Sequence, residues 1–224
     1  MSEVTLIAIT QPLIGLVEFG RPLTAEEFVA YTARVSNPSN QMNTETAPKL
    51  LKYLAKHHHW SPFEMVSMTF EIRTTRDIGR QILRHRSFTF QEFSQRYAEV
   101  HGDMIQREAR LQDHSNRQNS IEIDDAKIAM QWNRMQEAAY DTAKRNYKLA
   151  LDMGIAKEQA RALLPEGLTA STMYMTGSLR SFIHYCAIRC DKATQKEHRE
   201  IADKVLNIVI CQFPSLEGIL DANI

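Results

Sequence analysis

The part of the sequence that most constrains the fold is 64–86, where the spacing of apolar side chains changes abruptly. In "EMVSMTFEIR" (64–73) every second residue is apolar, which predicts a half-buried strand. In "TTRDIGRQILRHR" (74–86), Ile78 and Ile82 lie one helical turn apart, which predicts a helix. The opposite side of that helix carries a stripe of arginines, namely Arg76, Arg80 and Arg84. The fold must therefore combine strands with helices.

The rest of the chain is mostly helical in pattern. We expect one more strand, short and buried, at 4–10, and helices at 22–36, 47–59, 124–154, 156–164, 169–190 and 194–212. Thr24 and Glu27 have the spacing of a capping box at the start of the first helix. The polar segment 101–123 is predicted to be a loop or insertion. Together these elements predict an α+β fold in a single domain over 1–224.

The charge balance limits the classes of partner. The chain has 27 Lys plus Arg and 27 Asp plus Glu, so its formal net charge is zero. That balance argues against a general nucleic-acid binder, which carries a basic excess. Three cysteines are too few for a disulfide framework, the N-terminus shows no secretory signal, and no stretch approaches the ~20 apolar residues of a membrane span. We expect a reduced, cytoplasmic protein whose partners include neither nucleic acid nor a membrane.

Six arginines and no lysine lie between Arg73 and Tyr97, where Asp77 and Glu92 are the acids. Guanidinium groups fork onto phosphate or carboxylate oxygens, so this cluster suits an anionic ligand. Hydroxyl, amide and aromatic side chains follow it, and together these groups match the phosphate, base edge and flat ring of a nucleotide. Two alternatives stay open: a solvated helix face held by ion pairs, and a core role for the aromatic side chains.

Three consecutive histidines (57–59) precede Ser61-Pro62. Adjacent positions do not converge on one metal ion, so a polar helix end near the negative end of the dipole is favoured over a metal site. The Ser-Pro break places His59 and Ser61 at the entrance to the strand at 64–73, where a loop can face a cofactor.

Three ionisable residues interrupt the apolar stretch 169–190, namely Arg180, His184 and Arg189. A buried unpaired charge is costly, so each needs a polar or anionic partner. That partner is either an acid on a neighbouring helix, such as Glu166 or Glu197, or a bound anionic ligand. Arg161 presents the same choice. In the same stretch Cys186 and Cys190, four residues apart, are typical of core positions.

Common catalytic motifs are missing from the sequence. It contains no P-loop, no Gly-x-Gly-x-x-Gly and no Gly-x-Ser-x-Gly elbow. Ser94 has basic neighbours but no evident His-Asp pair, so nothing in the sequence supports a serine nucleophile.

The arrangement Arg84-His85-Arg86, seven residues, then Ser94 resembles the Arg-His-Arg-x7-Ser signature of flavin-dependent thymidylate synthases. Three further blocks resemble that family in the family's order: "TARVS" (32–36), "HWSPFE" (59–64) and "LRSFIHYCAIRCDKATQKEHREIA" (179–202). The resemblance thus spans 32–202, and four blocks in order make it specific.

The resemblance implies a fold, a reaction and an assembly. The family's α+β fold has a central, mostly antiparallel sheet with long helices packed around it. Its members methylate dUMP to dTMP, taking the one-carbon unit from 5,10-methylenetetrahydrofolate and reducing equivalents from NADPH through FAD. They form homotetramers in which each FAD lies between subunits, and we expect the same assembly here.

The resemblance also implies a set of site residues. Those expected to bind dUMP are Gln81, Arg84, Glu92, Phe93, Ser94, Gln95, Arg96, Arg161 and Arg189. Those expected to bind FAD are Ser61, Arg84, His85, Arg86, Glu92, Ser178, Arg180 and His184, with His59 as a further candidate. Arg189 is the expected catalytic residue, because a guanidinium against the uracil ring would stabilise the negative charge that develops there. Ser94 is expected to bind phosphate, and no metal is expected.

Three alternatives remain in other classes. A nucleotide-binding flavin reductase would use the same cofactor without transferring carbon. A single-stranded nucleic-acid-binding module would use 73–97 as a basic, aromatic patch. A metal hydrolase would use the histidine cluster.

Overall fold

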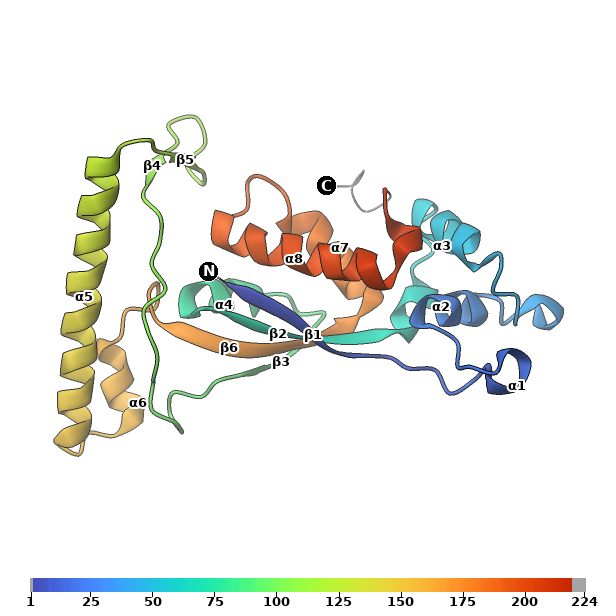
Figure 1. The fold of residues 1–224 in the computed structure, drawn as a ribbon, viewed down its shortest axis with the longest axis horizontal. Helices are drawn as coiled ribbons and strands as arrows, with labels where there is room; N and C mark the ends of the chain where they lie inside the picture. The colour runs from blue at the N-terminus through green and yellow to red at the C-terminus, as the bar shows by residue number, and fades with distance from the viewer. Residues whose placement is uncertain (1, 219–224) are drawn as a thin grey trace.

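The structure, a computed structural model, describes residues 2–218 and centres on a four-stranded antiparallel sheet (Figure 1). The strands are β1 (Glu3–Ile9), β2 (Ser67–Thr75), β3 (Thr89–Glu92) and β6 (Ala170–Ser178), in the spatial order β1-β2-β6-β3. β2 and β6 form the central pair, from Ser67 opposite Ser178 to Thr75 opposite Ala170. The predicted α+β fold with an antiparallel sheet is confirmed.

The prediction of one long helix over 169–190 is wrong, because its first half is the central strand β6. The sequence "ASTMYMTGS" alternates: Ser171, Met173 and Met175 are buried, whereas Thr172 and Thr176 are partly exposed and Tyr174 is exposed. Pairing with β2 on one side and β3 on the other satisfies its backbone. The helix α7 (Leu179–Arg189) begins only where Ser178 accepts a hydrogen bond from the backbone N–H of Ser181, 3.2 Å.

Strand β1 is present as predicted, but it is not buried. It lies at the edge of the sheet, and each of its residues is at least partly exposed. The alternation predicted for β2 is confirmed: Met68, Phe70 and Ile72 are buried, and the side chains between them are not. A short 3-10 helix, η2 (Ser61–Met65), precedes β2, so the strand begins later than the alternation suggests.

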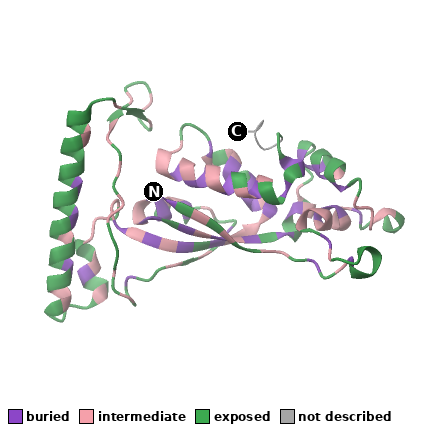
Figure 2. Cartoon of the chain, in the orientation of Figure 1, coloured by how far each residue is buried: buried purple, intermediate pink, exposed green. Residues whose placement is uncertain are grey.

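Helices α7 and α8 (Lys196–Gln212) lie over one face of the sheet (Figure 1). Figure 2 shows buried positions concentrated in the sheet and in these two helices. The core between them consists of buried apolar side chains that include Met68, Phe70, Ile72, Met173, Met175, Phe182, Val205 and Val209. This packing fixes the ends of β2, β6 and α7, from which many of the candidate site residues extend.

Figure 1 shows short helices after β1, at the end of the molecule opposite α5 (Ala126–Asp152). They are α1 (Leu16–Phe19), α2 (Ala25–Ala33), η1 (Pro38–Asn40) and α3 (Ala47–Lys56). Of these, α2 packs on α3 and on η2. The predicted capping box is confirmed: the N–H of Glu27 donates to Thr24 Oγ1 at 3.1 Å, and the N–H of Thr24 donates to Glu27 Oε2 at 2.8 Å. The arginine-rich helix α4 (Arg76–Ile82) directly follows β2 and ends before Arg84.

The segment 101–123, predicted to be a loop or insertion, contains a hairpin of β4 (Arg110–Gln112) and β5 (Ser120–Glu122). Ion pairs attach it to the start of α8: Arg110 binds Glu197, and Lys196 Nζ lies 2.7 Å from both Glu108 and Glu122. Polar anchors of this kind leave no apolar pattern in a sequence, which is why the periodicity did not show the hairpin.

The longest helix, α5 (Ala126–Asp152), stands at one end of the molecule and does not cover the sheet (Figure 1). Asp125 caps it and accepts from Lys127 N and Ile128 N. Among its residues only Gln136, Tyr140 and Tyr147 are buried. It is followed by α6 (Lys157–Ala160) and η3 (Arg161–Leu163), while η4 (Pro214–Leu216) follows α8. Of the helices in the described part of the chain, none is both long and apolar enough to span a membrane.

Candidate functional site

The predicted site residues meet most closely in a cavity of about 650 Å³ between α4, the end of α7 and the loop that leads into α8. Its lining includes Gln81, Arg84 and Arg189 together with Gln195. We call it the α4–α7 pocket. Helix α4 follows β2 and α7 follows β6, so the central strand pair brings these side chains together from positions about a hundred residues apart in sequence.

The four arginines of residues 76–86 divide into two kinds, those with an acid partner and those without one. Arg76 Nη1 lies 3.3 Å from Glu92, and Arg80 Nε donates to Glu166 at 2.7 Å. These two arginines fit one alternative from the sequence, a solvated helix face held by ion pairs. Within residues 2–218 neither Arg84 nor Arg86 has an ion-pair partner, and both are exposed. Two free guanidinium groups are therefore available to an anionic ligand.

Arg189, the expected catalytic residue, is partly buried and faces an imidazole. Its Nε donates to His85 Nε2 at 2.9 Å. Burial and the charge of Arg189 lower the pKa of His85 below its ordinary value, so His85 stays neutral and can accept at Nε2. This bond leaves the two Nη groups of Arg189 for a ligand in the pocket.

A buried polar layer that the sequence analysis missed lies behind Gln81 and His85. His198 is fully buried, with Nε2 3.1 Å from Tyr185 Oη and Nδ1 3.3 Å from Gln81 Oε1. Burial, the charge of Arg189 and the neighbouring His85 lower the pKa of His198 to about 3. A histidine inside the amphipathic pattern of 194–212 was the only available signal, and one sequence does not show what it contacts.

A second group of predicted residues surrounds Trp60, and we call it the Trp60 cluster. Arg180 Nη1 donates to Glu64 Oε1 at 2.9 Å, and the His184 ring meets the Trp60 ring edge-on at 4.8 Å. Ser61 lies beside them at the start of η2, and His59 precedes it. The acid that Arg180 contacts is therefore Glu64, not Glu166 or Glu197. Glu64 stands in the "HWSPFE" block, and nothing in the sequence indicates that it pairs with Arg180.

A third group gathers around α6, and we call it the Glu158 cluster. Arg96 Nε lies 3.3 Å from Glu158 Oε2, and Arg161 Nε donates to the backbone oxygen of Glu158 at 3.3 Å. The backbone oxygen of Ser94 accepts from Tyr97 and Ala98, which forms a turn beside α6. Among the described residues, no hydrogen bond or ion pair joins this cluster to the lining of the α4–α7 pocket.

Residues 92–95 lie between these groups, and two of them are partly enclosed. Glu92 Oε1 accepts from Arg76 and, at 2.9 Å, from Ser171 Oγ, so its carboxylate is used within the chain. Phe93 continues β3 through its N–H to Thr172 O and is 39% exposed. Gln95 is buried, yet its Nε2 has no hydrogen-bond partner among the described residues. A buried donor without an acceptor is costly, so a ligand or partner oxygen is expected there.

Ser178 has a structural contact that the resemblance did not indicate. It is the N-cap of α7, and its hydroxyl also lies 3.2 Å from Ser181 Oγ. Ser181 in turn donates to the backbone oxygen of Ser87, next to Arg86. The start of α7 thereby holds the loop that carries Arg84, His85 and Arg86.

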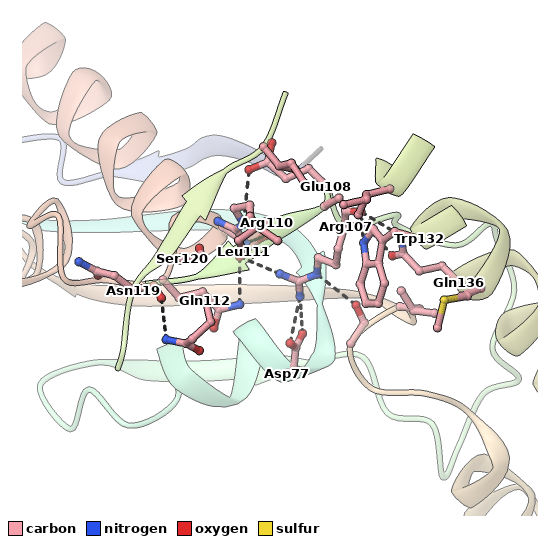
Figure 3. Close-up of a pocket in the computed structure, with 18 of the residues that line it drawn as sticks. Asp77, Arg107, Glu108, Arg110, Leu111, Gln112, Asn119, Ser120, Trp132 and Gln136 are labelled. Carbon is pink, nitrogen blue, oxygen red and sulfur yellow. Dashed lines mark hydrogen bonds and ion pairs between the residues drawn. The ribbon is translucent and has the colours of Figure 1, made fainter. Parts of the chain in front are cut away.

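A larger cavity, about 790 Å³, lies elsewhere, between the β4–β5 hairpin and α5 (Figure 3). None of the predicted site residues lines it. Its two inner arginines are already neutralised: Arg107 contacts Asp77 at 2.7 Å and Glu197 at 3.0 Å, and Arg110 contacts Glu197. Because those cations are paired, the smaller α4–α7 pocket with its unpaired arginines is the better site for an anion.

The histidine run 57–59 forms the polar end of a helix, as the sequence predicts. His57 caps α3, and its Nδ1 lies 2.8 Å from the backbone oxygen of Tyr53. No group of His, Cys, Asp and Glu able to hold a metal ion occurs among residues 2–218. Cys186 and Cys190 are both buried, as predicted for core cysteines.

Comparison with known proteins gives a consistent result. The family model described as "Thymidylate synthase complementing protein" (Thy1) matches residues 21–215. A probable flavin-dependent thymidylate synthase of Paramecium bursaria Chlorella virus 1 is 48% identical over 216 residues, 96% of this chain and 97% of the relative. A flavin-dependent thymidylate synthase of Synechocystis is 48% identical over 219 residues, 98% and 99% of the two chains.

A solved structure agrees with these relatives. The UMP/dUMP methylase PolB from Streptomyces cacaoi, bound with 5-Br dUMP, superposes with a TM-score of 0.84 at 26% sequence identity. The match covers 99% of this chain and 95% of that one. These similarities favour carbon transfer to a pyrimidine nucleotide over a flavin reductase or a single-stranded nucleic-acid-binding module.

Proposed function

Since this chain belongs to the family of flavin-dependent thymidylate synthases, we propose which of its residues carry out that family's reaction. The enzyme methylates dUMP to dTMP and takes the one-carbon unit from 5,10-methylenetetrahydrofolate. The observation that carries the assignment is the α4–α7 pocket, where Arg84 and Arg189 line one cavity and neither has an acid partner among the described residues.

The residues around this pocket fit FAD. The cofactor carries a pyrophosphate, and the exposed, unpaired guanidinium groups of Arg84 and Arg86 suit its charge. We assign Arg84, His85 and Arg86 to FAD, together with Ser61, Arg180 and His184 of the Trp60 cluster. His59 and Ser178 are further contacts, and Glu92 is assigned to both ligands. FAD held by these residues would supply hydride chemistry, with NADPH as the source of reducing equivalents.

Arg189 is the catalytic residue in this proposal. Uracil C5 is a poor nucleophile, and negative charge develops on the pyrimidine as carbon transfer begins. A fixed guanidinium at the polar edge of the ring stabilises that charge without reorganising. Arg189 Nε donates to His85 Nε2, and this bond holds the guanidinium in place. Because His85 is neutral, it adds no second positive charge beside Arg189. Gln81 and Arg84 complete the lining of the pocket around the nucleotide.

Ser94 acts as a ligand and not as a nucleophile. In the part of the chain that the structure describes, its hydroxyl has no histidine or carboxylate partner that would activate it. Ser94, Arg96 and Arg161 instead offer donors to a phosphate. Gln95, with its unpaired buried Nε2, lies in the same segment. We assign these residues, with Phe93, to the phosphate and sugar of dUMP.

The complete site is formed between subunits. No hydrogen bond or ion pair among the described residues joins the α4–α7 pocket to the Glu158 cluster, yet one nucleotide needs both a base site and a phosphate site. We place the two groups in different subunits of a homotetramer, with FAD between them. The exposed apolar side chains of α5 and of its C-cap residue suit such an interface: Met135 is 64% exposed, Leu149 56% and Met153 72%.

The three described cysteines are free thiols, which suits a reducing compartment, and we place the enzyme in the cytoplasm. The chain is proposed to act as a single catalytic domain over 1–224, with the β4–β5 hairpin as part of it.

The function is tested by adding dUMP and labelled methylenetetrahydrofolate to the purified, FAD-loaded enzyme with NADPH. Labelled dTMP is expected, and flavin bleaching without labelled dTMP would contradict the proposal. The shared site is tested by complementation. Arg189→Ala and Arg96→Ala are each expected to lose most of the turnover alone, but hybrids made by co-expression should regain part of the activity. Hybrids that stay inactive would place both residues in one subunit.

A further inference from the structure

A row of polar side chains runs from the core to the α4–α7 pocket. Tyr185 Oη lies 3.1 Å from His198 Nε2, and His198 Nδ1 lies 3.3 Å from Gln81 Oε1. Gln81 Nε2 then donates to Gln195 Oε1 at 2.7 Å. Gln195 Nε2 donates to Glu197 Oε2 at 2.9 Å. The row joins α7, α8 and α4, and the mechanism described above uses only Gln81.

The charge of Glu197 gives this row one direction. Burial would raise the pKa of Glu197, but hydrogen bonds from Arg110 and Gln195 and the charge of Arg107 lower it to about 2. Glu197 is therefore a carboxylate that only accepts, so Gln195 must turn its NH2 toward it and its oxygen toward Gln81. Gln81 must then turn its NH2 toward Gln195 and its oxygen toward His198.

The same logic fixes the proton on the histidine. Gln81 Oε1 can only accept, so His198 Nδ1 carries the proton and Nε2 accepts from the Tyr185 hydroxyl. A neutral His198 is required, and its pKa of about 3 meets that requirement. Any flip of the Gln81 amide would set its NH2 against the N–H of His198.

The consequence lies at the pocket surface. The NH2 of Gln81 has two hydrogens; one goes to Gln195, and the second is free for the pocket that Gln81 lines. Arg84 and Arg189 also offer only donors. The carboxylates in the lining are already used within the chain, because Asp77 accepts from Arg107 and Asp191 accepts from Ala193 N. We propose that Tyr185 and His198 are positioning residues that lock Gln81 as a donor, so that the pocket accepts the carbonyl oxygens of uracil and rejects the amino group of cytosine. This inference rests on the proposed binding of dUMP in the α4–α7 pocket.

Tyr185→Phe is the sharpest test, because it removes one hydroxyl and keeps the ring that packs on His85 and Phe88. His198 can then move its proton from Nδ1 to Nε2, so that Gln81 Oε1 faces a lone pair and only the bond to Gln195 still orients the amide. We measure the KM for dUMP and the inhibition constant of dCMP on FAD-loaded enzyme. Losing one uncharged hydrogen bond should raise the KM about three- to tenfold. The ratio of the dCMP inhibition constant to the dUMP KM should fall by a similar factor, while kcat changes less.

Two further variants separate positioning from stability. Tyr147→Phe is the matched control: it also removes the hydroxyl of a buried tyrosine, one that accepts from Val100 N, far from the pocket, and it should leave the ratio unchanged. His198→Asn keeps a donor near the Nδ1 position and should retain most of the selectivity, whereas His198→Leu should lose it. A lower melting temperature in Tyr185→Phe with an unchanged ratio would overturn the inference.

Gln81→Leu distinguishes this inference from the proposed function. If Gln81→Leu raises the KM for dUMP and Tyr185→Phe does not, the positioning role is wrong and the binding site stands. If Gln81→Leu leaves the KM unchanged, Gln81 does not meet the nucleotide and both assignments of Gln81 fail. In a Gln81→Leu background, Tyr185→Phe should have no further effect on the ratio, since the two changes act through one amide.

Discussion

Gly177 on β6 leaves no room for a side chain. Substituting it tests how tightly the core holds the loop that carries Arg84, His85 and Arg86. A Cβ placed there would lie 2.4 Å from Cδ1 and 2.7 Å from Cε1 of Phe88. Both distances are far below van der Waals contact. The Phe88 ring cannot move aside without disturbing the core, because it packs against Phe182 at 4.8 Å and is only 7% exposed. Gly177→Ala must therefore shift the ring, the strand or both.

The expected cost is that of an overpacked core, about 1–3 kcal/mol in unfolding free energy. For a domain of this size each kcal/mol corresponds to a melting temperature lower by about 2–4 °C. Phe88 also follows the loop that carries Arg84, His85 and Arg86. A displaced ring moves that loop, so Gly177→Ala should lose bound FAD as well as stability.

The assay is urea unfolding followed by tryptophan fluorescence, with flavin absorbance per subunit measured in parallel. Gly79→Ala is the matched control, since its Cβ would lie 3.7 Å from Glu92 Oε1, an ordinary contact. In helix α4 that change should be neutral or stabilise by about 0.4–1 kcal/mol. Phe88→Leu should relieve the clash, so that the double variant is more stable than the two single effects predict. A Gly177→Ala protein as stable as the parent would refute the packing argument.

Three other outcomes follow from the site. Arg189→Ala should keep FAD but lower turnover about a hundredfold or more, as measured by dTMP formation; normal turnover would remove Arg189 from the catalytic role. Ser94→Ala should raise the KM for dUMP and keep measurable turnover, whereas complete loss with intact dUMP binding would revive a nucleophilic serine. His198 has a folded-state pKa below its unfolded value, so its contribution to stability is full above about pH 6.5 and is lost as the pH falls toward 3. Between these limits His198 contributes up to about 1.4 kcal/mol per pH unit to the slope of the unfolding free energy against pH. In urea unfolding, the free energy of His198→Asn should therefore fall less steeply as the pH is lowered. Equal slopes in the two proteins would mean that His198 titrates normally.

Local patterns predicted much of the fold correctly. The alternation in β2 and the capping box at Thr24 depend on neighbours within a few residues, and the sequence displays those neighbours directly. The same logic failed for β6, because "ASTMYMTGS" runs without a break into the apolar helix α7. What makes β6 a strand is its pairing with β2 and β3, and those partners are about eighty to a hundred residues away in sequence.

In the candidate site, too, the sequence predicted some features and only the structure shows others. Family motifs named Arg84, Arg189 and Ser94, but they did not show which arginines already have an acid partner. Arg76 and Arg80 have the same side chain as Arg84, and only the position of Glu92 and Glu166 distinguishes them. His198 and Tyr185 lie outside the set of residues that the motifs assigned to the ligands.

The sequence by itself determined the kinds of side chain available, the local helices and turns, and the family. The tertiary structure decided which charges are neutralised, which buried groups meet, and which amide faces the pocket. The reason is physical: backbone conformation responds mainly to near neighbours along the chain, whereas ion pairs and hydrogen bonds depend on distance in space.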